Sequence, residues 1–433
     1  MVCGFAAELS GCGSAPVATD SSDAGTDATG VDACTGSCDC EPSGTLLWRS
    51  TYRAPELQRV LGRAMARLPD GRLVVAGVHV AYTPDDLVYG DESLWVAIFD
   101  REGAIETSTV AFTVPASVSP EGGHGVAADG SRIAVVGSVR EGAWPVGVLA
   151  VYDLQLEELW TLRDEPEVGS AWTGVALEED GSVVVTGATY RPTEDSTATV
   201  LRLSATGERE WTQQVEGTDS EPYFATNRAQ SVATGDGLAW VVGTLYNAHD
   251  FGEPDIWAAA WRPDGTMALQ EFYDSRTELT TYASTGLDLG HGVAIAPDGA
   301  VLVCGVHEVE KPKDVGSYSA GERWARLLGA DGAERWTFWH DDPNVYPGAA
   351  YGAAFDGCGN AFVVGEESAS FEADSHMFLA KLTPNGQLLW DVSDDQPTSW
   401  RFGSYAVVAD DDGSAVVLTS EGDDTIVLSR WSP

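Results

Sequence analysis

Positively charged side chains are scarce in this sequence. Its 433 residues include 24 Lys and Arg against 67 Asp and Glu, which gives a formal net charge of −43. Only three of the basic residues are lysines: Lys311, Lys313 and Lys381. Phosphate backbones and anionic lipid surfaces are bound by clusters of Lys and Arg. We therefore expect no nucleic-acid partner and no electrostatic attachment to a membrane.

Long apolar runs and linear catalytic motifs are also missing. Without a run of 18 apolar residues, the sequence predicts no membrane-spanning helix. It contains no G-x-S-x-G, H-E-x-x-H, phosphate-loop or dinucleotide-binding signature. The segment 410–413 (D-D-D-G) resembles a calcium loop but lacks its alternating ligands and distal glutamate, so it indicates a hairpin turn. The motifs thus identify no catalytic residue, no metal ligand and no cofactor.

The first 43 residues differ in composition from the rest. Leu9-Ser10-Gly11-Cys12 resembles a bacterial lipobox, in which the cysteine carries lipid. Residues 1–12 would then be a truncated signal peptide, although they lack a basic start and contain Glu8; a chance match is the alternative. Residues 13–43, rich in Ala, Ser, Thr, Asp and Gly, predict a flexible linker. This interpretation gives an outer-membrane or cell-surface lipoprotein, or a secreted protein, whose membrane contact is a lipid anchor at Cys12.

The remaining cysteines fall into two groups. Cys34, Cys38 and Cys40 precede the folded part, and two of them are expected to form a local disulfide in an oxidising compartment. Cys304 and Cys358 occupy different levels of different repeats. About five strand residues, or roughly 17 Å, separate those levels, whereas a disulfide needs α-carbons within about 7 Å. We predict that Cys304 and Cys358 are not bonded to each other.

A pattern of 57 residues on average recurs seven times. Each copy has a small residue, then usually an alanine, a tight turn with glycine, and a closing glycine after a valine-rich run. The first and last turn glycines, Gly71 and Gly413, are 342 positions apart. The small positions are Ala64, Gly125, Gly174, Ser231, Gly292, Gly352 and Ala406. The closing positions are Gly77, Gly137, Gly187, Gly243, Gly305, Gly365 and Thr419.

Each copy reads as four strands. Two β-rich runs around the turn form a hairpin, and a third strand, a second tight turn and a tryptophan-marked fourth strand follow. Four strands per repeat of this length predict a seven-bladed, all-β propeller over residues 44–433. The chain stops after a third strand at Trp431, and the missing turn and fourth strand stand at residues 43–48 (S-G-T-L-L-W). The N-terminal strand is therefore expected to complete the last blade, and the tryptophans Trp48, Trp160, Trp211, Trp336 and Trp390 to lie in the core.

The repeat resembles the bacterial SBBP-type and delta-sixty-type propeller repeats. The likeness is carried by residues 67–77 (R-L-P-D-G-R-L-V-V-A-G) and 332–336 (G-A-E-R-W). It extends over nearly all of 44–433. The resemblance implies a surface or secreted propeller and no particular reaction.

One residue stands before the small position in every copy. These residues are polar or amphipathic and are expected to ring the mouth of the central channel, where they would bind a ligand: Arg63, His124, Thr173, Gln230, His291, Tyr351 and Tyr405. The alternative is that they bond channel water and neighbouring backbone. His124 and His291 share the motif G-H-G-V-A, but they lie three blades apart, too far to share a metal unless the channel is narrow.

The same face carries the long loops and many aromatic residues, which suit a saccharide or a protein partner. The aromatics are Tyr82, Tyr89, Trp172, Tyr190, Tyr223, Phe224, Tyr246, Phe251, Tyr282, Tyr318, Tyr346 and Trp400. We expect a monomeric binding or scaffold module for glycan or protein. The alternatives are an enzyme acting on an extracellular polymer, using Arg63, His124, His291, Tyr351 and Tyr405, and a structural envelope lipoprotein.

Overall fold

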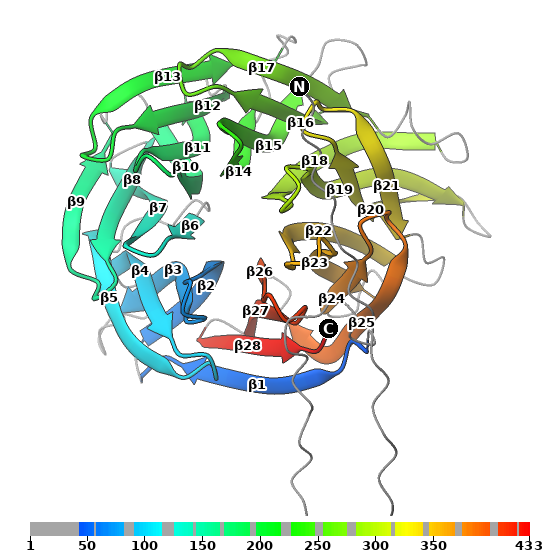
Figure 1. The fold of residues 1–433 in the computed structure, drawn as a ribbon, viewed down its shortest axis with the longest axis horizontal. Helices are drawn as coiled ribbons and strands as arrows, with labels where there is room; N and C mark the ends of the chain where they lie inside the picture. Colours follow the sequence, from blue (N-terminus) through cyan, green and yellow to red (C-terminus); the bar gives the residue numbers. More distant parts are fainter. Residues whose placement is uncertain are drawn as a thin grey trace, which may run out of the picture. The chain divides into compact units, whose positions relative to one another are not determined.

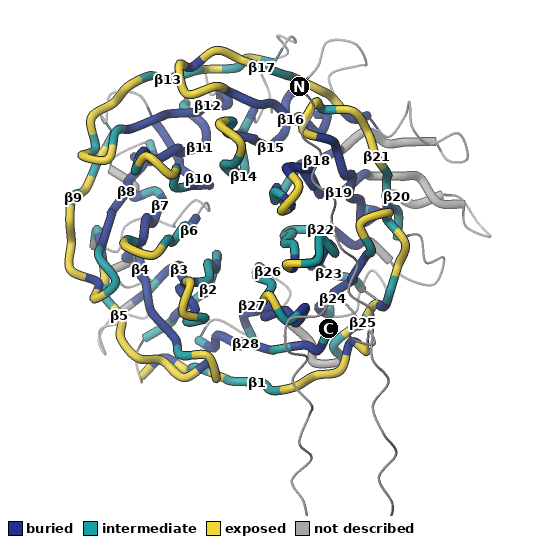
Figure 2. The backbone as a smooth tube through the Cα atoms, in the orientation of Figure 1, coloured by how far each residue is buried: buried dark blue, intermediate teal, exposed yellow. Residues whose placement is uncertain are grey.

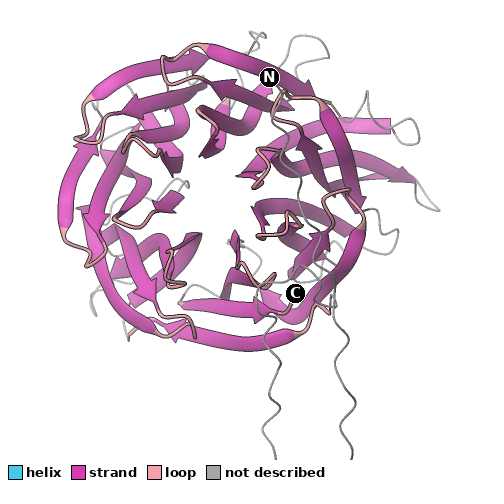
Figure 3. Ribbon diagram, viewed as in Figure 1, coloured by secondary structure: helices cyan, strands magenta, loops and turns pink. Residues whose placement is uncertain are grey.

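The computed structural model describes residues 43–433, except 56–57, 82–90, 115–124, 142–143, 165–168, 191–195, 218–226, 247–253, 275–282, 313–316, 341–345, 369–374, 399–405 and 422–423. The described residues form 28 strands and no helix (Figure 3). Accordingly, none of them forms a helix long and apolar enough to cross a membrane. By its contacts the chain divides into Met1–Thr35 and Gly36–Pro433, and the strands belong to the second unit.

The strands form seven antiparallel sheets of four, arranged as blades around a central axis (Figure 1). The predicted seven-bladed propeller is confirmed. Blade one contains β2 (Gln58–Arg67), β3 (Leu73–Ala81), β4 (Asp91–Phe99) and β5 (Ile105–Val114). Blade two contains β6 (Gly125–Ala128), β7 (Arg132–Glu141), β8 (Trp144–Asp153) and β9 (Glu158–Arg163). Blade three contains β10 (Gly169–Leu177), β11 (Val183–Tyr190), β12 (Ser196–Leu203) and β13 (Arg209–Val215).

The other four blades repeat this order from the axis outward. Blade four contains β14 (Arg228–Gly235), β15 (Leu238–Tyr246), β16 (Pro254–Trp261) and β17 (Met267–Tyr273). Blade five contains β18 (Ala283–Ile295), β19 (Val301–Pro312), β20 (Ser317–Leu328) and β21 (Glu334–His340). Blade six contains β22 (Tyr346–Phe355), β23 (Ala361–Ser368), β24 (Ser375–Leu382) and β25 (Leu388–Thr398). Blade seven contains β26 (Ala406–Ala409), β27 (Ala415–Glu421), β28 (Thr425–Trp431) and β1 (Leu46–Arg53).

The two ends of the propeller close the ring at blade seven. Strand β1 pairs antiparallel with β28, as the split repeat predicts. The amide of Ser43 donates to the carbonyl of Pro433 at 2.8 Å, and the amide of Ser432 donates to the carbonyl of Thr45 at 2.9 Å. The second bond matches one in blade six, where the amide of Thr383 donates to the carbonyl of Gln387 at 2.8 Å. The chain ends therefore rebuild, without a covalent link, the turn that other blades make continuously.

Neighbouring blades bury apolar surface against each other. The two middle strands of each sheet are mostly buried, most of the innermost strands are partly buried, and the outermost strands are largely exposed (Figure 2). Between blades four and five, for example, Trp240, Ile256 and Trp324 pack in one buried cluster. Each blade therefore depends on both neighbours for its core, as expected for a repeat architecture.

The outer-strand tryptophans link consecutive blades at the rim. Trp211 donates its indole N–H to the carbonyl of Pro263 in the next blade at 2.9 Å, and Trp390 reaches the carbonyl of Pro433 at 3.1 Å. Trp160 and Trp336 make the same bond to the following blade. Four of the five tryptophans expected in the core are only partly buried: Trp48, Trp160, Trp211 and Trp336. All four nevertheless pack against buried core clusters, so they lie at the outer edge of the core.

The cysteines behave as the strand register predicts. Cys304 is free and buried, whereas Cys358 is disulfide-bonded, so the two do not pair. The partner of Cys358 lies outside the described residues, and so do Cys12, Cys34, Cys38 and Cys40. Much of the face expected to carry long loops also lies outside them. Where it is described, β19 continues to Pro312 and β20 starts at Ser317, so residues 306–312 and 317–322 are paired strands rather than loop.

Candidate functional site

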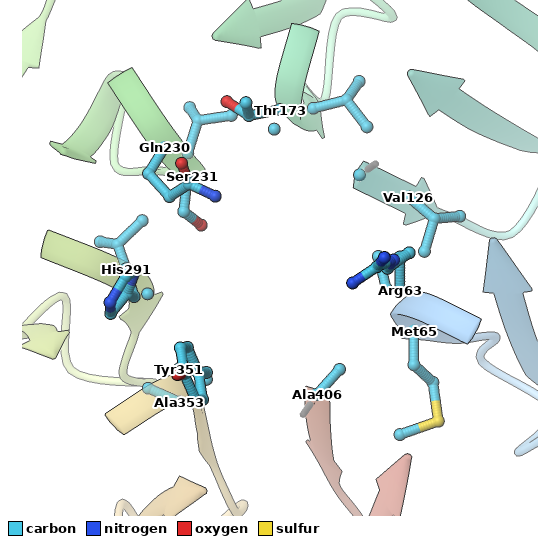
Figure 4. Close-up of a pocket in the computed structure, with 18 of the residues that line it drawn as sticks. Arg63, Met65, Val126, Thr173, Gln230, Ser231, His291, Tyr351, Ala353 and Ala406 are labelled. Atoms are coloured by element: carbon cyan, nitrogen blue, oxygen red, sulfur yellow. The ribbon is translucent and has the colours of Figure 1, made fainter. Parts of the chain in front are cut away.

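The candidate ring residues sit at a β-bulge in every blade where the structure describes them. In blade one the register between β2 and β3 shifts between Gly62 and Ala64, which leaves Arg63 as the extra residue. The same shift leaves Thr173, Gln230, His291 and Tyr351 as extra residues in blades three to six. A bulge bends its strand and re-aims a side chain. All five side chains line one central cavity (Figure 4).

The bulge explains the closing glycine of the repeat. In each of these five blades, a Cβ placed on that glycine would collide with the carbonyl oxygen two residues before the ring residue. The glycines are Gly77, Gly187, Gly243, Gly305 and Gly365. In blade seven the described ladder starts with Ala406 opposite Leu418, so Thr419 faces no such bulge among the described residues. Glycine is thus required wherever a bulge presses a carbonyl onto the second strand.

The central cavity has a volume of about 270 Å³ and two tiers of lining. The ring residues form a polar tier, to which Ser231 adds a hydroxyl. The residue after each small position forms an apolar tier that the sequence analysis did not identify: Met65, Val126, Val175, Val232, Val293, Ala353 and Val407. These residues could have been found from their position in the repeat, because in the five bulged blades three consecutive residues of the inner strand line the cavity.

His291 and Tyr351 form the aromatic side of the polar tier. Their ring centroids are 4.9 Å apart at an interplanar angle of 47°. Desolvation lowers the pKa of His291 to about 4, so its imidazole is neutral near pH 7 and offers one hydrogen-bond donor and one acceptor. The Tyr351 hydroxyl donates to Glu366 Oε1 at 2.7 Å, which holds the phenol ring in place.

Arg63 is the only charged residue among the described residues that line the cavity. Figure 4 shows it on the opposite side of the cavity from His291 and Gln230. Burial lowers the pKa of Arg63, but the guanidinium of an arginine remains protonated at neutral pH. A cation at the axis of a strongly acidic protein creates local affinity for an anionic group.

The structure also limits which ring residues and which loop aromatics can contact a ligand. Thr173 is buried, and its hydroxyl donates to the carbonyl of Ala229 in the next blade at 2.6 Å, so it serves the packing of blades. His124 and Tyr405 lie outside the described residues. Among the loop aromatics, Trp172 is buried in the core between blades two and three and is not a surface platform.

Comparisons with known proteins find only distant structural similarity. No family model and no curated protein matches the sequence, so the repeat resemblance and the lipobox stay predictions. A protein of unknown function from Dyadobacter fermentans is similar over 90% of this chain and 99% of its own, at 10% identity and a TM-score of 0.48. The β-propeller domain of the trilobed protease from Pyrococcus furiosus is similar over 86% and 93%, at 14% identity and a TM-score of 0.44. An α-L-arabinanase from Penicillium chrysogenum complexed with arabinobiose is similar over 90% and 98%, at 13% identity and a TM-score of 0.42. Likenesses this distant carry no information about what the present cavity binds.

Proposed function

We propose that this protein is an extracytoplasmic binding propeller whose axial cavity takes a small, polar, anionic ligand, namely a saccharide that bears a carboxylate. The observation that carries the proposal is the set of bulged ring residues converging on one cavity, with Arg63 as its only described charge. Each hydrogen-bonding side chain of the polar tier can pair with a group of such a ligand. Arg63 matches a carboxylate bidentately, and the amide of Gln230 and the neutral imidazole of His291 match hydroxyls.

The apolar tier and the aromatic pair fit the other face of a sugar. A sugar ring presents C–H groups as well as hydroxyls, and aromatic rings pack against such surfaces. The Tyr351 ring is held by its hydroxyl bond to Glu366 and by contact with His291. The cavity volume of about 270 Å³ lies at the lower end of the usual range for small-ligand sites. It suits a terminal sugar unit better than the middle of a polymer.

Binding fits the cavity better than hydrolysis does. Cleavage of a glycosidic bond ordinarily uses two carboxyl groups on either side of the scissile bond. The described lining contains neither aspartate nor glutamate; Glu366, which accepts a hydrogen bond from the Tyr351 hydroxyl, is not part of it. Arg63, His291 and Tyr351 therefore enter the proposal as ligand-binding residues.

The extracytoplasmic location is part of the proposal. The disulfide at Cys358 favours an oxidising compartment, because cytosolic thiols are kept reduced. The lipid anchor at Cys12 rests on the lipobox and the linker that follows it.

Paired neutral and acidic sugars test the binding function on the full chain. Glucose is compared with glucuronate and galactose with galacturonate, by calorimetry and by thermal shift at fixed salt. The acidic member of a pair should raise Tm saturably. In Arg63→Gln its affinity should fall about 10- to 100-fold, the loss expected for a buried hydrogen bond to a charged group.

The matched control is Arg72→Gln, which removes an arginine that pairs with Asp70 and Glu106 on the opposite, hairpin face. It should leave the affinity unchanged. Equal binding of neutral and acidic sugars, or unchanged affinity in Arg63→Gln, would refute the proposed ligand class. A panel without any saturable shift would refute the small-ligand function and direct attention to the loop face and a protein partner.

A further inference from the structure

Three carboxylates are buried together at the contact between blades four and five. Asp255, Asp274 and Asp288 are 5%, 9% and 0% exposed. One oxygen of each lies within 4.8 Å of one oxygen of each of the others. Three negative charges at such spacing are unfavourable in a buried environment unless a positive charge or protons join them.

The cluster draws on both blades. Asp255 lies in β16 and Asp274 directly follows β17, both in blade four, whereas Asp288 lies in β18 of blade five. The backbone of β18 lies close to blade four here. The amide of Gly290 donates to Thr244 Oγ1 at 3.3 Å, and a Cβ on Gly290 would collide with the carbonyl of Gly243. Contacts of the backbone therefore hold the three carboxylates together.

A buried histidine provides the second, independent observation. His307 stands directly opposite Asp288 in the β18–β19 ladder and is 0% exposed. Its Nδ1 lies 2.9 Å from Asp288 Oδ1, so the ring is aimed into the cluster. Yet neither ring nitrogen meets hydrogen-bond geometry with any group in the described part of the chain. The Nδ1 atom thus faces one carboxylate of the cluster without a well-formed hydrogen bond, and such a buried imidazole is costly unless a further ligand joins it.

The aromatic surroundings fix this imidazole. The ring of His307 contacts Trp324 edge-on at a centroid distance of 4.9 Å and Trp339 at 5.0 Å. Because the histidine cannot turn toward solvent, its nitrogens remain at the cluster. Metal-ligating side chains are typically oriented in this way by their neighbours.

We propose that Asp255, Asp274 and Asp288 bind one divalent cation that joins blade four to blade five, with His307 beside Asp288 at the edge of the site. Carboxylate oxygens suit Ca²⁺ and Mn²⁺, whereas an imidazole nitrogen adds preference for Mn²⁺ or Zn²⁺. The cation adds positive charge where three buried carboxylates crowd together, next to the imidazole that faces Asp288. It also anchors β18, the strand that carries His291 into the axial cavity.

The competing account is neutralisation by the protein itself. Arg326 on β20 stacks over the ring of Tyr273 at 4.7 Å, next to Asp274 in the sequence. Its guanidinium also donates from Nε to Thr337 Oγ1 at 2.8 Å. If protein cations or bound protons balance the cluster, no metal will bind there.

Metal binding is tested on the full chain after chelation and dialysis. Ca²⁺, Mn²⁺, Zn²⁺ and Mg²⁺ are added singly in a background of sodium chloride, which screens the acidic surface. Elemental analysis after equilibrium dialysis should find one equivalent of at least one of these ions, and that ion should raise Tm saturably. The preferred ion identifies the role of His307: Zn²⁺ or Mn²⁺ indicates direct ligation, and Ca²⁺ indicates ligation by the carboxylates.

Asp288→Asn locates the site. It should weaken binding at least tenfold and abolish the rise in Tm. In the metal-free state, however, the variant should be no less stable than the wild type, because one of three crowded charges is gone. Asp264→Asn, in an exposed turn of blade four, is the control and should bind like the wild type.

A measurement on the wild type alone keeps the test decisive if Asp288→Asn does not fold. Tb³⁺ replaces Ca²⁺ in oxygen-rich sites, and the indole of Trp324 lies near enough to sensitise its emission. Saturable sensitised emission that is displaced by the preferred cation supports the site. The proposal is overturned if no ion is retained by dialysis and no emission appears, or if Asp288→Asn binds as the wild type does.

Discussion

The replacement of Gly187 by alanine tests the link between the bulge and the closing glycine. The new Cβ would stand 2.0 Å from the carbonyl oxygen of Ala171 and 2.9 Å from the Cα of Trp172, whereas real Cβ contacts are essentially never closer than 3.0 Å. The carbonyl must therefore retreat by at least about 1 Å, against a strand that is buried along most of its length.

The magnitude follows from what that movement breaks. Two ladder hydrogen bonds around the bulge are lost or bent, at about 1 kcal/mol each. Overpacking of the inner strand adds about 1–3 kcal/mol. The lower conformational entropy of alanine in the unfolded chain returns about 0.5–1 kcal/mol. We expect a net destabilisation of about 2–4 kcal/mol, which corresponds to a fall in Tm of about 3–5 °C for a propeller of this size.

The assay is thermal and guanidinium unfolding of Gly187→Ala beside Gly130→Ala. Gly130 is the control because a Cβ there would meet only Pro69 Cγ, at 3.9 Å. It should change the free energy of unfolding by less than about 0.5 kcal/mol. If the two variants were equally stable, the closing glycine would have no role in accommodating the bulge, and the structural explanation of the repeat would be wrong.

Two further perturbations address the cavity and the ring closure. The pKa of His291 is about 4 in the folded protein and 6.5 in the reference state, so the unfolded chain takes up the proton first as the pH falls. The contribution of His291 to the free energy of unfolding should be complete above about pH 6.5 and should fall by about 3 kcal/mol by pH 4. His291→Gln should remove this part of the pH dependence of stability. If both proteins lost stability in parallel over this range, the desolvated, neutral imidazole would be refuted. A chain starting at Ser43 keeps β1, whereas one starting at Ala54 leaves blade seven with three strands and exposes the edge of β28. The shorter chain should aggregate or melt well below the longer one in light scattering and calorimetry, and equal melting would contradict closure by β1.

The architecture could be predicted well from the sequence because the tight turns of each repeat require particular residues, above all glycine. A glycine with positive φ stands in the tight turn between the third and fourth strands of five blades, and the structure places Gly44 (φ 56°) in the same role as Gly386 (φ 78°). In blade two Leu156 (φ 62°) takes this position. Such positions are local requirements of the backbone, and therefore visible in a sequence. Ring closure could be predicted for the same reason, since the split repeat left half of a turn at each end.

The metal cluster could not be predicted because its residues share no local pattern. Asp255, Asp274, Asp288 and His307 come from different strands of two blades, at separations of 19, 14 and 19 residues. Metal motifs are recognised by short spacings on one turn, hairpin or helix. In this protein the ligands meet only because two sheets pack against each other, and the acidic composition hides three carboxylates among 67 acidic residues.

The seven copies of the repeat also separate scaffold from site without reference to any other protein. The closing position is glycine in six of seven copies, and in the five where the structure describes the bulge a carbonyl occupies the space where a side chain would lie. The ring position, two residues after that carbonyl, holds Arg, His, Thr, Gln, His, Tyr and Tyr. The bulge that forces uniformity on one strand directs the variable side chain of the other into the channel. Uniform and variable positions are thus two results of one backbone irregularity. Substitutions at the ring, apart from the buried Thr173, should alter binding with little effect on the fold, whereas substitutions at the glycines should destabilise the fold.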